Sequence, residues 1–401
     1  MGSGKRYGGY KSWSWLEAGR DYRAFKLARE VGRVPSKVIE LSKAEEERVE
    51  EIIRKNIVIS LHDHTFVWPE NPGEFIEYAR NGRWWIGYEG LAVSGLDGVF
   101  EGMLDGVALM RSPDPWDWDN VIHQIGMIQA DIDHQDLVFI ARRAGDFERA
   151  FREGRVTMVI HLEGPPNIRE DLSRVEILYG LGVRCMGIAY SRGNEFGSGL
   201  ADRVDRGLTD LDYELVRRMN RLGMLIDLAH AGDRTSLDVI EASKDPVVIT
   251  HAGARTLWLS RRMKPDEVIQ ALAERGGVFG VEAAPHTTIT RNNPRHSIES
   301  VMEHFQYIEK LVGIDHVAFG PDTIFGDHVA LHSIFREYLA LTSIEENLPP
   351  FPRVEYVDGL ENPSEFRNIV RWLVKHGYSD QEIAKVVGGN ILRVVRRVWG
   401  E

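Results

Sequence analysis

Short apolar runs alternate with amphipathic stretches along most of this 401-residue chain. The runs are rich in β-branched residues, which favour strands, whereas many stretches between them carry apolar residues at helical spacing. A capping box, Ser42 followed by Glu45, opens a charged helix that leads into the first run. The runs that we interpret as strands are residues 57–64, 106–110, 156–162, 183–189, 224–229, 247–250, 278–283 and 317–320.

Strands that alternate with helices form parallel βα units, and eight of them predict a closed (β/α)8 TIM-like barrel of the α/β class. Residues 119–153 are expected to be helical, and two helices near the C-terminus are expected to seal the outer layer of the barrel. Residues 1–45 are polar, aromatic and irregular, so we expect an N-terminal arm packed on a single barrel domain spanning residues 46–401. The tryptophan-rich segment after residue 64 is expected to form loop insertions that pack on the scaffold or line a substrate pocket.

Side chains that can bind metals lie at the ends of these runs. His62 and His64 end the first run, and residues i and i+2 of a strand point to the same side. The carboxyl ends of barrel strands converge on one mouth, where active sites are built. The sequence therefore predicts a single site at this mouth. Its expected members are His62, His64, Glu163, His230, His251 and Asp322.

Four histidines and a glutamate, without cysteine, form a nitrogen and oxygen ligand set that suits Zn²⁺, with Fe, Mn, Ni and Co as alternatives. The number of ligands matches two metals. The first would be held by His62 and His64, and the second by His230 and His251. Glu163 would bridge the metals with one oxygen to each. Such a pair acidifies a shared water and polarises a carbonyl oxygen, which is hydrolytic chemistry.

Asp322 follows the last run and is predicted to be the proton shuttle of this hydrolysis. It would take a proton from the nucleophilic water and give it to the leaving group, which requires hydrogen-bonding distance to both. The alternative is a carboxylate that only caps the following loop.

Charge and cysteine content narrow the class of protein. The net charge of −12 argues against nucleic acid or an anionic membrane as a partner, so a small-molecule substrate is expected. The single cysteine, Cys185, lies in an apolar run and is expected to be a core thiol. Because no disulfide can form within the chain, we expect a cytoplasmic protein. No apolar run reaches the length of a membrane span, and the N-terminal residues lack a signal-peptide core.

Several short segments follow one another in the order and spacing of a known family. They are Leu162-Glu163-Gly164, Asp227-Leu228-Ala229-His230, Thr250-His251-Ala252, Phe319-Gly320-Pro321-Asp322 and residues 181–184, 260–266, 359–362 and 388–393. On these segments the chain resembles the membrane (renal) dipeptidase family, peptidase family M19, a branch of the amidohydrolase superfamily. The resemblance extends from about residue 55 to the C-terminus. It implies a metal-dependent (β/α)8 hydrolase, and dimers are common in that family.

The resemblance also implies a dinuclear zinc site and assigns roles to residues. Glu163 corresponds to the bridging glutamate and Asp322 to the acid/base residue. Arg262 corresponds to the clamp for a substrate carboxylate, a role that suits the fork of a guanidinium group. The histidine ligands implied by the resemblance are His62 on one metal and, on the other, His230 and His251.

Two positions depart from the family pattern. His64 stands where the first strand of the family usually carries aspartate, which removes one negative charge from the site. Pro166 stands where the family motif Glu-Gly-Gly-His has the histidine that helps to hold the scissile carbonyl. Asn167 and His161 are the candidates to replace it, and the sequence does not choose between them.

The sequence thus supports one main function and two alternatives. The main hypothesis is a dipeptidase-like amidohydrolase that cleaves the amide bond of a small substrate bearing a carboxylate. With Pro166 in place of histidine, the same scaffold could instead act on an N-acyl amino acid, a cyclic amide or a lactone. A third hypothesis is a metal-binding module without turnover, against which the presence of Asp322 argues.

Overall fold

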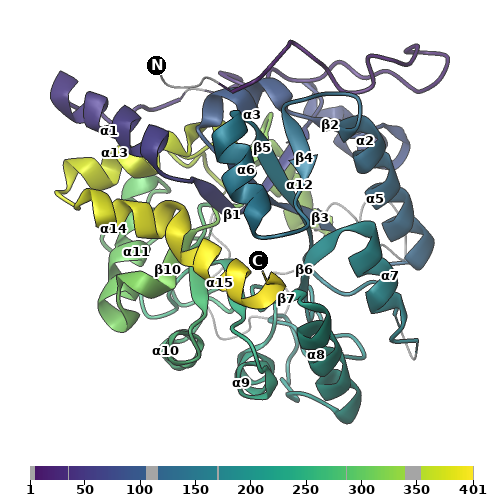
Figure 1. The fold of residues 1–401 in the computed structure, drawn as a ribbon, viewed down its shortest axis with the longest axis vertical. Coiled ribbons are helices and arrows are strands. Elements are labelled where there is room, and N and C mark those ends of the chain that lie inside the picture. Colours follow the sequence, from purple (N-terminus) through teal and green to yellow (C-terminus); the bar gives the residue numbers. More distant parts are fainter. Residues whose placement is uncertain are drawn as a thin grey trace.

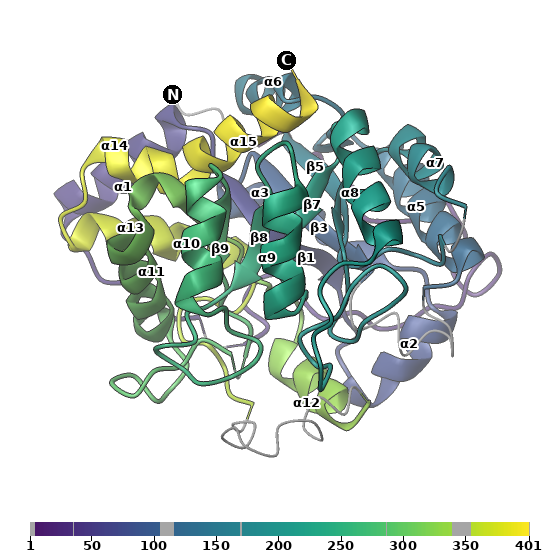
Figure 2. The ribbon, with the colours of Figure 1, turned by 90° about the horizontal axis from the view of Figure 1, so that it is seen from below.

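The computed structural model describes residues 5–34, 36–104, 116–168, 171–285, 287–338 and 354–400. A parallel sheet forms its centre, and helices cover the outside of the sheet (Figures 1 and 2). The short strand β2 (Trp85–Ile86) pairs antiparallel with β1, β4 (Val138–Ile140) pairs with the start of β5, and β11 (Ile324–Phe325) pairs with β1. The barrel strands are β1 (Ile59–Val67), β3 (Gly98–Leu104), β5 (Val156–Leu162), β6 (Val183–Gly187), β7 (Leu225–Asp227), β8 (Val248–Ala252), β9 (Val278–Val281) and β10 (Val317–Phe319).

The two ends of the sheet come together to close a barrel. The strand order runs from β10 through β9, β8, β7, β6, β5, β3 and β1 to β11, which follows β10 after a short connection. Within this connection the Asp322 N–H donates to the His62 carbonyl (3.0 Å), and the His64 N–H donates to the Thr323 carbonyl (2.9 Å). β1 therefore bonds to β3 on one side and to the segment after β10 on the other. This arrangement confirms the predicted (β/α)8 barrel.

The helices lie mainly on the outer face of the sheet (Figure 2). Helix α1 begins at the predicted capping box, in which the side chains of Ser42 and Glu45 each bond to the backbone of the other residue. Within the described residues, no helix is both long and apolar enough to cross a membrane. Short 3₁₀ turns occur at Pro72–Glu74, Ile314–His316 and Pro363–Glu365, and a π-helical turn at Lys385–Gly389. The helices are α1 (Lys43–Lys55), α2 (Phe75–Asn81), α3 (Tyr88–Ser94), α5 (Trp118–Ile132), α6 (Gly145–Glu153), α7 (Arg174–Leu181), α8 (Asp210–Leu222), α9 (Asp233–Ala242), α10 (Asp266–Glu274), α11 (Ile298–Val312), α12 (His328–Tyr338), α13 (Arg367–Lys375), α14 (Asp380–Ala384) and α15 (Asn390–Trp399).

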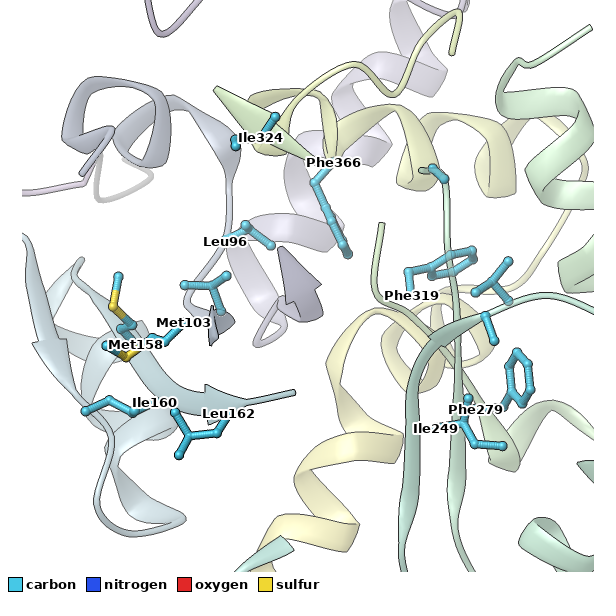
Figure 3. Packing of buried hydrophobic residues seen from close by; sticks show 14 of the residues in the cluster. Leu96, Met103, Met158, Ile160, Leu162, Ile249, Phe279, Phe319, Ile324 and Phe366 are labelled. Carbon is cyan, nitrogen blue, oxygen red and sulfur yellow. The ribbon is translucent and has the colours of Figure 1, made fainter. Parts of the chain in front are cut away.

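Buried apolar side chains form two layers. The outer layer lies between strands and helices, and Figure 3 shows part of it, including Met158, Ile160 and Leu162 of β5. The inner layer fills the barrel and receives side chains from every barrel strand and from α15. Its members include Ile59, Leu61, Phe100, Val159, Cys185, Leu225, Val248, Val278, Ala318, Ile391, Val394 and Val395. α15 therefore packs on the inner layer, at the barrel end opposite the strand ends that carry the candidate site, and does not merely complete the outer layer as predicted. Cys185 is a core thiol, as expected.

The segment between residues 64 and 156 differs most from the prediction. The predicted strand at 106–110 lies outside the described residues, and the strand that pairs with β1 and β5 is β3, within a segment expected to be loop. Residues 119–153 are not one helical stretch, because β4 separates α5 from α6. The first strand also does not end at His64, since it continues to Val67 and pairs there with β2 and β11.

The N-terminal residues pack against this same segment. Lys5 Nζ lies 2.5 Å from Asp97 Oδ1, and the Trp13 indole donates to the Trp84 carbonyl at 2.9 Å. The Ala28 N–H donates to the Trp68 carbonyl (2.9 Å), so the contacts extend along much of the described N-terminal segment. The predicted boundary at residue 45 falls just inside α1 and stays a prediction.

Candidate metal centre

The structure brings all six predicted ligand and shuttle residues to the same end of the barrel. In the first group, Nε2 of His62 lies 3.4 Å from Asp322 Oδ1, and Nε2 of His64 lies 3.1 Å from the same oxygen. Both histidines also lie 3.9 Å from Oε1 of Glu163. These three side chains, His62, His64 and Asp322, have ligand atoms close enough together to hold one ion.

The second group forms around the other carboxylate oxygen of Glu163. Nε2 of His230 lies 3.1 Å from Glu163 Oε2, and Nε2 of His251 lies 3.5 Å from it. The two Nε2 atoms are 3.1 Å apart. Glu163 thus presents Oε1 to one histidine pair and Oε2 to the other, which is the geometry that a bridging carboxylate needs.

Irregularities in two strands aim the histidines at this point. Between Ser60 and Asp63, β1 has one residue more than the facing part of β3, and between Ile249 and Ala252, β8 has one residue more than β9. A bulge of this kind changes which face of the sheet the following side chains point to. Leu61 and Val248 belong to the inner core layer. The bulges that follow them allow the histidines of both strands to face the barrel interior as well.

Gly102 on β3 leaves the space that these ligands occupy. A Cβ atom added there would lie 2.5 Å from His64 Cε1, 2.7 Å from His62 Cε1 and 2.8 Å from Glu163 Oε1. Such contacts are too short to be accommodated without moving the ligands. Glycine is therefore the residue that fits at this position.

Each ligand histidine has a neighbour for its Nδ1 atom, so that Nε2 is left for the centre. His64 Nδ1 lies 2.9 Å from the Gly102 carbonyl, an acceptor, so His64 carries its proton on Nδ1. The other three pairs are His230 with Ser191 Oγ (3.2 Å), His251 with Thr250 Oγ1 (2.8 Å) and His62 with His161 Nδ1 (3.3 Å). A histidine that donates from Nδ1 offers the unprotonated Nε2 that metal binding requires.

Burial keeps three of the four ligand histidines neutral. It lowers the pKa of His62 to about 3 and holds the pKa of His230 and His251 well below the usual value. For Asp322, burial acts to raise the pKa, but the adjacent His62 and His64 side chains outweigh it and the pKa lies well below its usual range. Neutral imidazoles beside anionic carboxylates are the states that bind divalent metals.

Arg262 does reach the site, but its guanidinium already contacts protein groups there. Its Nη2 lies 2.5 Å from Oε2 of Glu282, and its Nη1 donates to the His251 carbonyl at 3.0 Å. Glu282 is fully buried, and burial raises its pKa to about 7. With His251 and Asp322, Glu282 forms a further group that could hold an ion.

Glu282 is a residue of this group that the sequence analysis did not predict. It directly follows β9, just as Glu163 directly follows β5. The signal was available, because a charged residue stood inside the apolar run at 278–283.

Aromatic rings line the second group. The Tyr190 ring stacks on His230 with centroids 4.3 Å apart, and Trp116 lies 5.5 Å from Tyr190. A Cβ added at Gly164, next to Glu163, would lie 3.1 Å from the Trp116 ring. Trp116 therefore flanks the site, whereas Trp68 and Trp84 are buried and pack against each other.

Neither candidate for the missing family histidine has gained support. His161 is fully buried inside the barrel, where it contacts His62 through Nδ1 and Asp227 through Nε2 (3.1 Å). The Asn167 N–H donates to the Trp116 carbonyl (2.7 Å), and its own carbonyl accepts from Arg174. Both contacts of His161 are with side chains inside the barrel, so His161 supports the ligand His62 and does not face a substrate.

Comparison with known proteins adds a family match and several relatives. Residues 109–331 and 353–399 match the model of the membrane dipeptidase family, peptidase family M19. Dipeptidase tcpJ of Claviceps purpurea (strain 20.1) is 26% identical over 282 residues, which cover 70% of this chain and 60% of the relative. Dipeptidase verJ of Clonostachys rogersoniana is 28% identical over 280 residues, covering 69% and 64%. The chain thus spans less than two thirds of the length of these curated relatives.

Solved structures show the same fold. An amidohydrolase from Pseudomonas aeruginosa superposes with a TM-score of 0.72 and 25% identity, covering 88% of this chain and 99% of that one. A metallopeptidase from Rhodobacter sphaeroides superposes with a TM-score of 0.66 and 20% identity, covering 86% and all of that chain (100%).

Proposed function

The chain belongs to the membrane dipeptidase family, peptidase family M19, and on this basis we propose that it is a metal-dependent hydrolase that cleaves the amide bond of a small substrate such as a dipeptide. The observation that carries the proposal is the position of Glu163, with one carboxylate oxygen facing each of two histidine pairs. Metal binding is a property of the family, and the donor atoms found here fit it.

We propose two Zn²⁺ ions as the resident metals, with other divalent ions able to replace them. His62 and His64 would hold one, His230 and His251 the other, and Glu163 would bridge them. A bound pair would supply an acidified water as nucleophile and an electrophile for the substrate carbonyl oxygen. The Asp322 carboxylate lies in the same group as His64, but it corresponds to the acid/base residue of the family and does not restore the negative charge that His64 removes.

Asp322 is proposed to carry the proton. Its carboxylate stands at the first histidine group, and its backbone has a φ of 57°, in the left-handed region that non-glycine residues rarely adopt. The hydrogen bond from its N–H to the His62 carbonyl helps to fix this conformation. From there Asp322 would accept a proton from the nucleophilic water and return it to the leaving amine.

Arg262 is proposed to bind the carboxylate of the substrate. Because its Nη2 contacts Glu282, a substrate carboxylate has to share or displace that ion pair. Glu282 therefore lowers the affinity of Arg262 for anionic groups, and the clamp is weaker than a free arginine would be.

Pro166 favours the alternative reaction on an N-acyl amino acid, a cyclic amide or a lactone. The Pro166 side chain has no hydrogen-bonding group with which to hold the scissile carbonyl as the family histidine does. Lactones and strained cyclic amides depend less on that contact, because the ester bond or the ring strain activates the carbonyl.

The remaining assignments are proposals from the sequence. They are an arm of residues 1–45 on a single hydrolase domain of residues 46–401, a homodimer, and a cytoplasmic location inferred from the single cysteine.

A substrate panel tests the proposed reaction. Purified protein, stripped of metal and then reloaded with Zn²⁺, is assayed on L,L and L,D dipeptides, N-acyl amino acids, cyclic amides and lactones. The proposal expects turnover of dipeptides that depends on metal. Turnover of only the other classes would select the alternative, and metal-loaded protein without activity on any class would contradict hydrolysis.

A further inference from the structure

One buried carboxylate touches the hydrogen-bond partners of two ligand histidines. Asp227, at the end of β7, has only 2% of its surface exposed and uses Oδ2 for two contacts. His161 Nε2 lies 3.1 Å from this oxygen, and Thr250 Oγ1 lies 2.8 Å from it. We propose, resting on the metal site of the proposed function, that Asp227 sets which ring nitrogen is protonated on His62 and on His251, one histidine in each group.

The connection to His251 follows from counting hydrogens. A carboxylate can only accept, so the Thr250 hydroxyl gives its single hydrogen to Asp227. The same hydroxyl lies 2.8 Å from His251 Nδ1 and has only lone pairs left for it. His251 must therefore donate from Nδ1, and its Nε2 keeps the lone pair that faces Glu163.

The connection to His62 passes through a second histidine. His161 donates from Nε2 to Asp227, and in its neutral form its Nδ1 is then an acceptor. His62 Nδ1 lies 3.3 Å from that atom and supplies the hydrogen. His62 Nε2 is left unprotonated toward the first group. If His161 instead carried its proton on Nδ1, His62 would be protonated on Nε2 and could not bind a metal there.

The carboxylate itself is firmly held. Its Oδ1 accepts from the backbone N–H groups of Thr250 (2.8 Å) and Ala229 (3.1 Å). All four contacts of Asp227 are with donors, which is the surrounding of an anionic acceptor. The other two ligand histidines use separate partners, the Gly102 carbonyl for His64 and Ser191 Oγ for His230. Asp227 thus acts on one member of each pair as a positioning residue.

Asp227→Asn is expected to reverse the direction of the hydrogen bonds that link residue 227 to His62 and to His251, because asparagine has nearly the same shape as aspartate but can donate. An amide nitrogen in the place of Oδ2 would donate to His161 Nε2 and to Thr250 Oγ1, so that His62 and His251 would both be protonated on Nε2. An asparagine that imposes the wrong histidine tautomer while leaving the geometry intact is known from the serine protease triad. Two further variants separate the connections, since Thr250→Val interrupts only the one to His251 and His161→Phe only the one to His62.

The first measurement is ¹⁵N NMR of the histidine rings in metal-free protein, which reports the protonated nitrogen directly. Wild type is expected to carry the proton on Nδ1 of His62 and His251, and Asp227→Asn on Nε2 of both. Ser191→Ala is the control, because it removes the partner of His230 alone and should leave the other two unchanged. Retention of Nδ1–H on both histidines in Asp227→Asn would overturn the proposal.

The second measurement is metal affinity by chelator competition, with Zn²⁺ added stepwise. Asp227→Asn is expected to weaken both binding steps by about 10–100-fold, the usual effect of removing a partner of a ligand histidine. Thr250→Val and His161→Phe should each weaken one step, and not the same one. Equal losses at both steps in all three variants, accompanied by a lower free energy of unfolding, would mean a merely structural role. If wild type binds no metal, the proposed metal-dependent function is contradicted. The NMR measurement still tests the effect of Asp227 on the two histidine tautomers.

Discussion

Asp322 is the residue whose geometry bears most directly on the proposed chemistry. It lies within 3.4 Å of Nε2 of both histidines in the first group, and it could serve there as a ligand, a proton shuttle or both. Asp322→Asn is expected to retain the metals, because Glu163 and four histidines remain, while kcat falls by about 10²–10⁴-fold. Metal analysis and steady-state kinetics on the same sample check this. Full activity in the variant would exclude the shuttle, and loss of one metal would make Asp322 primarily a ligand.

The ion pair between Arg262 and Glu282 leads to opposite predictions for its two members. Arg262→Ala should raise KM about 10–100-fold for carboxylate substrates and leave amidated analogues nearly unchanged, as expected for a lost charged hydrogen bond. Glu282→Gln should lower KM for the carboxylate substrates, because the guanidinium is released. Metal content is measured in parallel, since Glu282 also lies near His251 and Asp322. Equal effects on both substrate classes would mean that Arg262 does not bind the substrate carboxylate.

Individual site residues were predictable wherever a polar side chain ended an apolar run. That pattern located His62, His64, Glu163, His230, His251 and Asp322, because a barrel brings all its strand ends to one mouth. Glu282 escaped because it was included in the run at 278–283. The part played by His161 and Asp227 could not be predicted, since it depends on hydrogen bonds between β5, β7 and β8.

At the scale of the strands, the site depends on two bulges and one glycine that the sequence pattern does not reveal. Strict alternation along β1 would place Leu61 and His62 on opposite faces, and the bulge between Ser60 and Asp63 changes this. β3 was mistaken for loop because Gly98, Gly102 and the charged Glu101 weaken its strand pattern. Glu101 is nevertheless fully buried and accepts the Thr65 N–H at 2.7 Å.

Gly102→Ala tests the role of β3. The added methyl group would meet His62, His64 and Glu163 at less than normal contact distances, so metal affinity should fall by about 10-fold or more while the fold is retained. The control is Gly126→Ala in the middle of α5, where nothing lies within 4 Å of the new Cβ and helix stability should rise by about 0.5–1 kcal/mol. Chelator competition and circular dichroism provide the two readouts. Unchanged metal affinity in Gly102→Ala would show that the ligands do not need this space.

At the scale of the whole molecule, one end of the barrel carries the candidate site, whereas the opposite end is closed by apolar packing. α15 fills the opposite end with apolar side chains, which the C-terminal position of that helix did not suggest. The barrel itself was predictable from the alternation of runs and helices. The contacts of residues 5–34 with the segment after β1 were not, because they join parts of the chain far apart in sequence.

Stability should depend on pH through a buried acidic pair outside the site. Burial, with Glu365 and Asp327 nearby, raises the pKa of Glu361 from 4.5 to about 9. Between these two pH values the folded state binds a proton that the unfolded state has released. The contribution of protonated Glu361 to the free energy of unfolding is therefore fully present below about pH 4.5 and is lost as the pH rises through 9.

Glu361→Gln removes this dependence. Relative to wild type, the variant should gain free energy of unfolding between pH 5 and pH 9, by up to about 1.4 kcal/mol per pH unit, because unfolded wild type releases a proton that folded Glu361 retains. Urea unfolding at both pH values measures the difference, with Glu274→Gln at the exposed end of α10 as the control. A difference between wild type and Glu361→Gln that does not change with pH would contradict the assignment.

We propose that Glu163 bridges two metals held by His62, His64, His230 and His251. Elemental analysis of the purified protein after equilibration with Zn²⁺ and removal of loosely bound ions tests it most directly. A bridged pair predicts about two equivalents per chain, in line with the two histidine groups on either side of one carboxylate. One equivalent, or none, would contradict a dinuclear site and mean that His64 in place of aspartate has changed the centre.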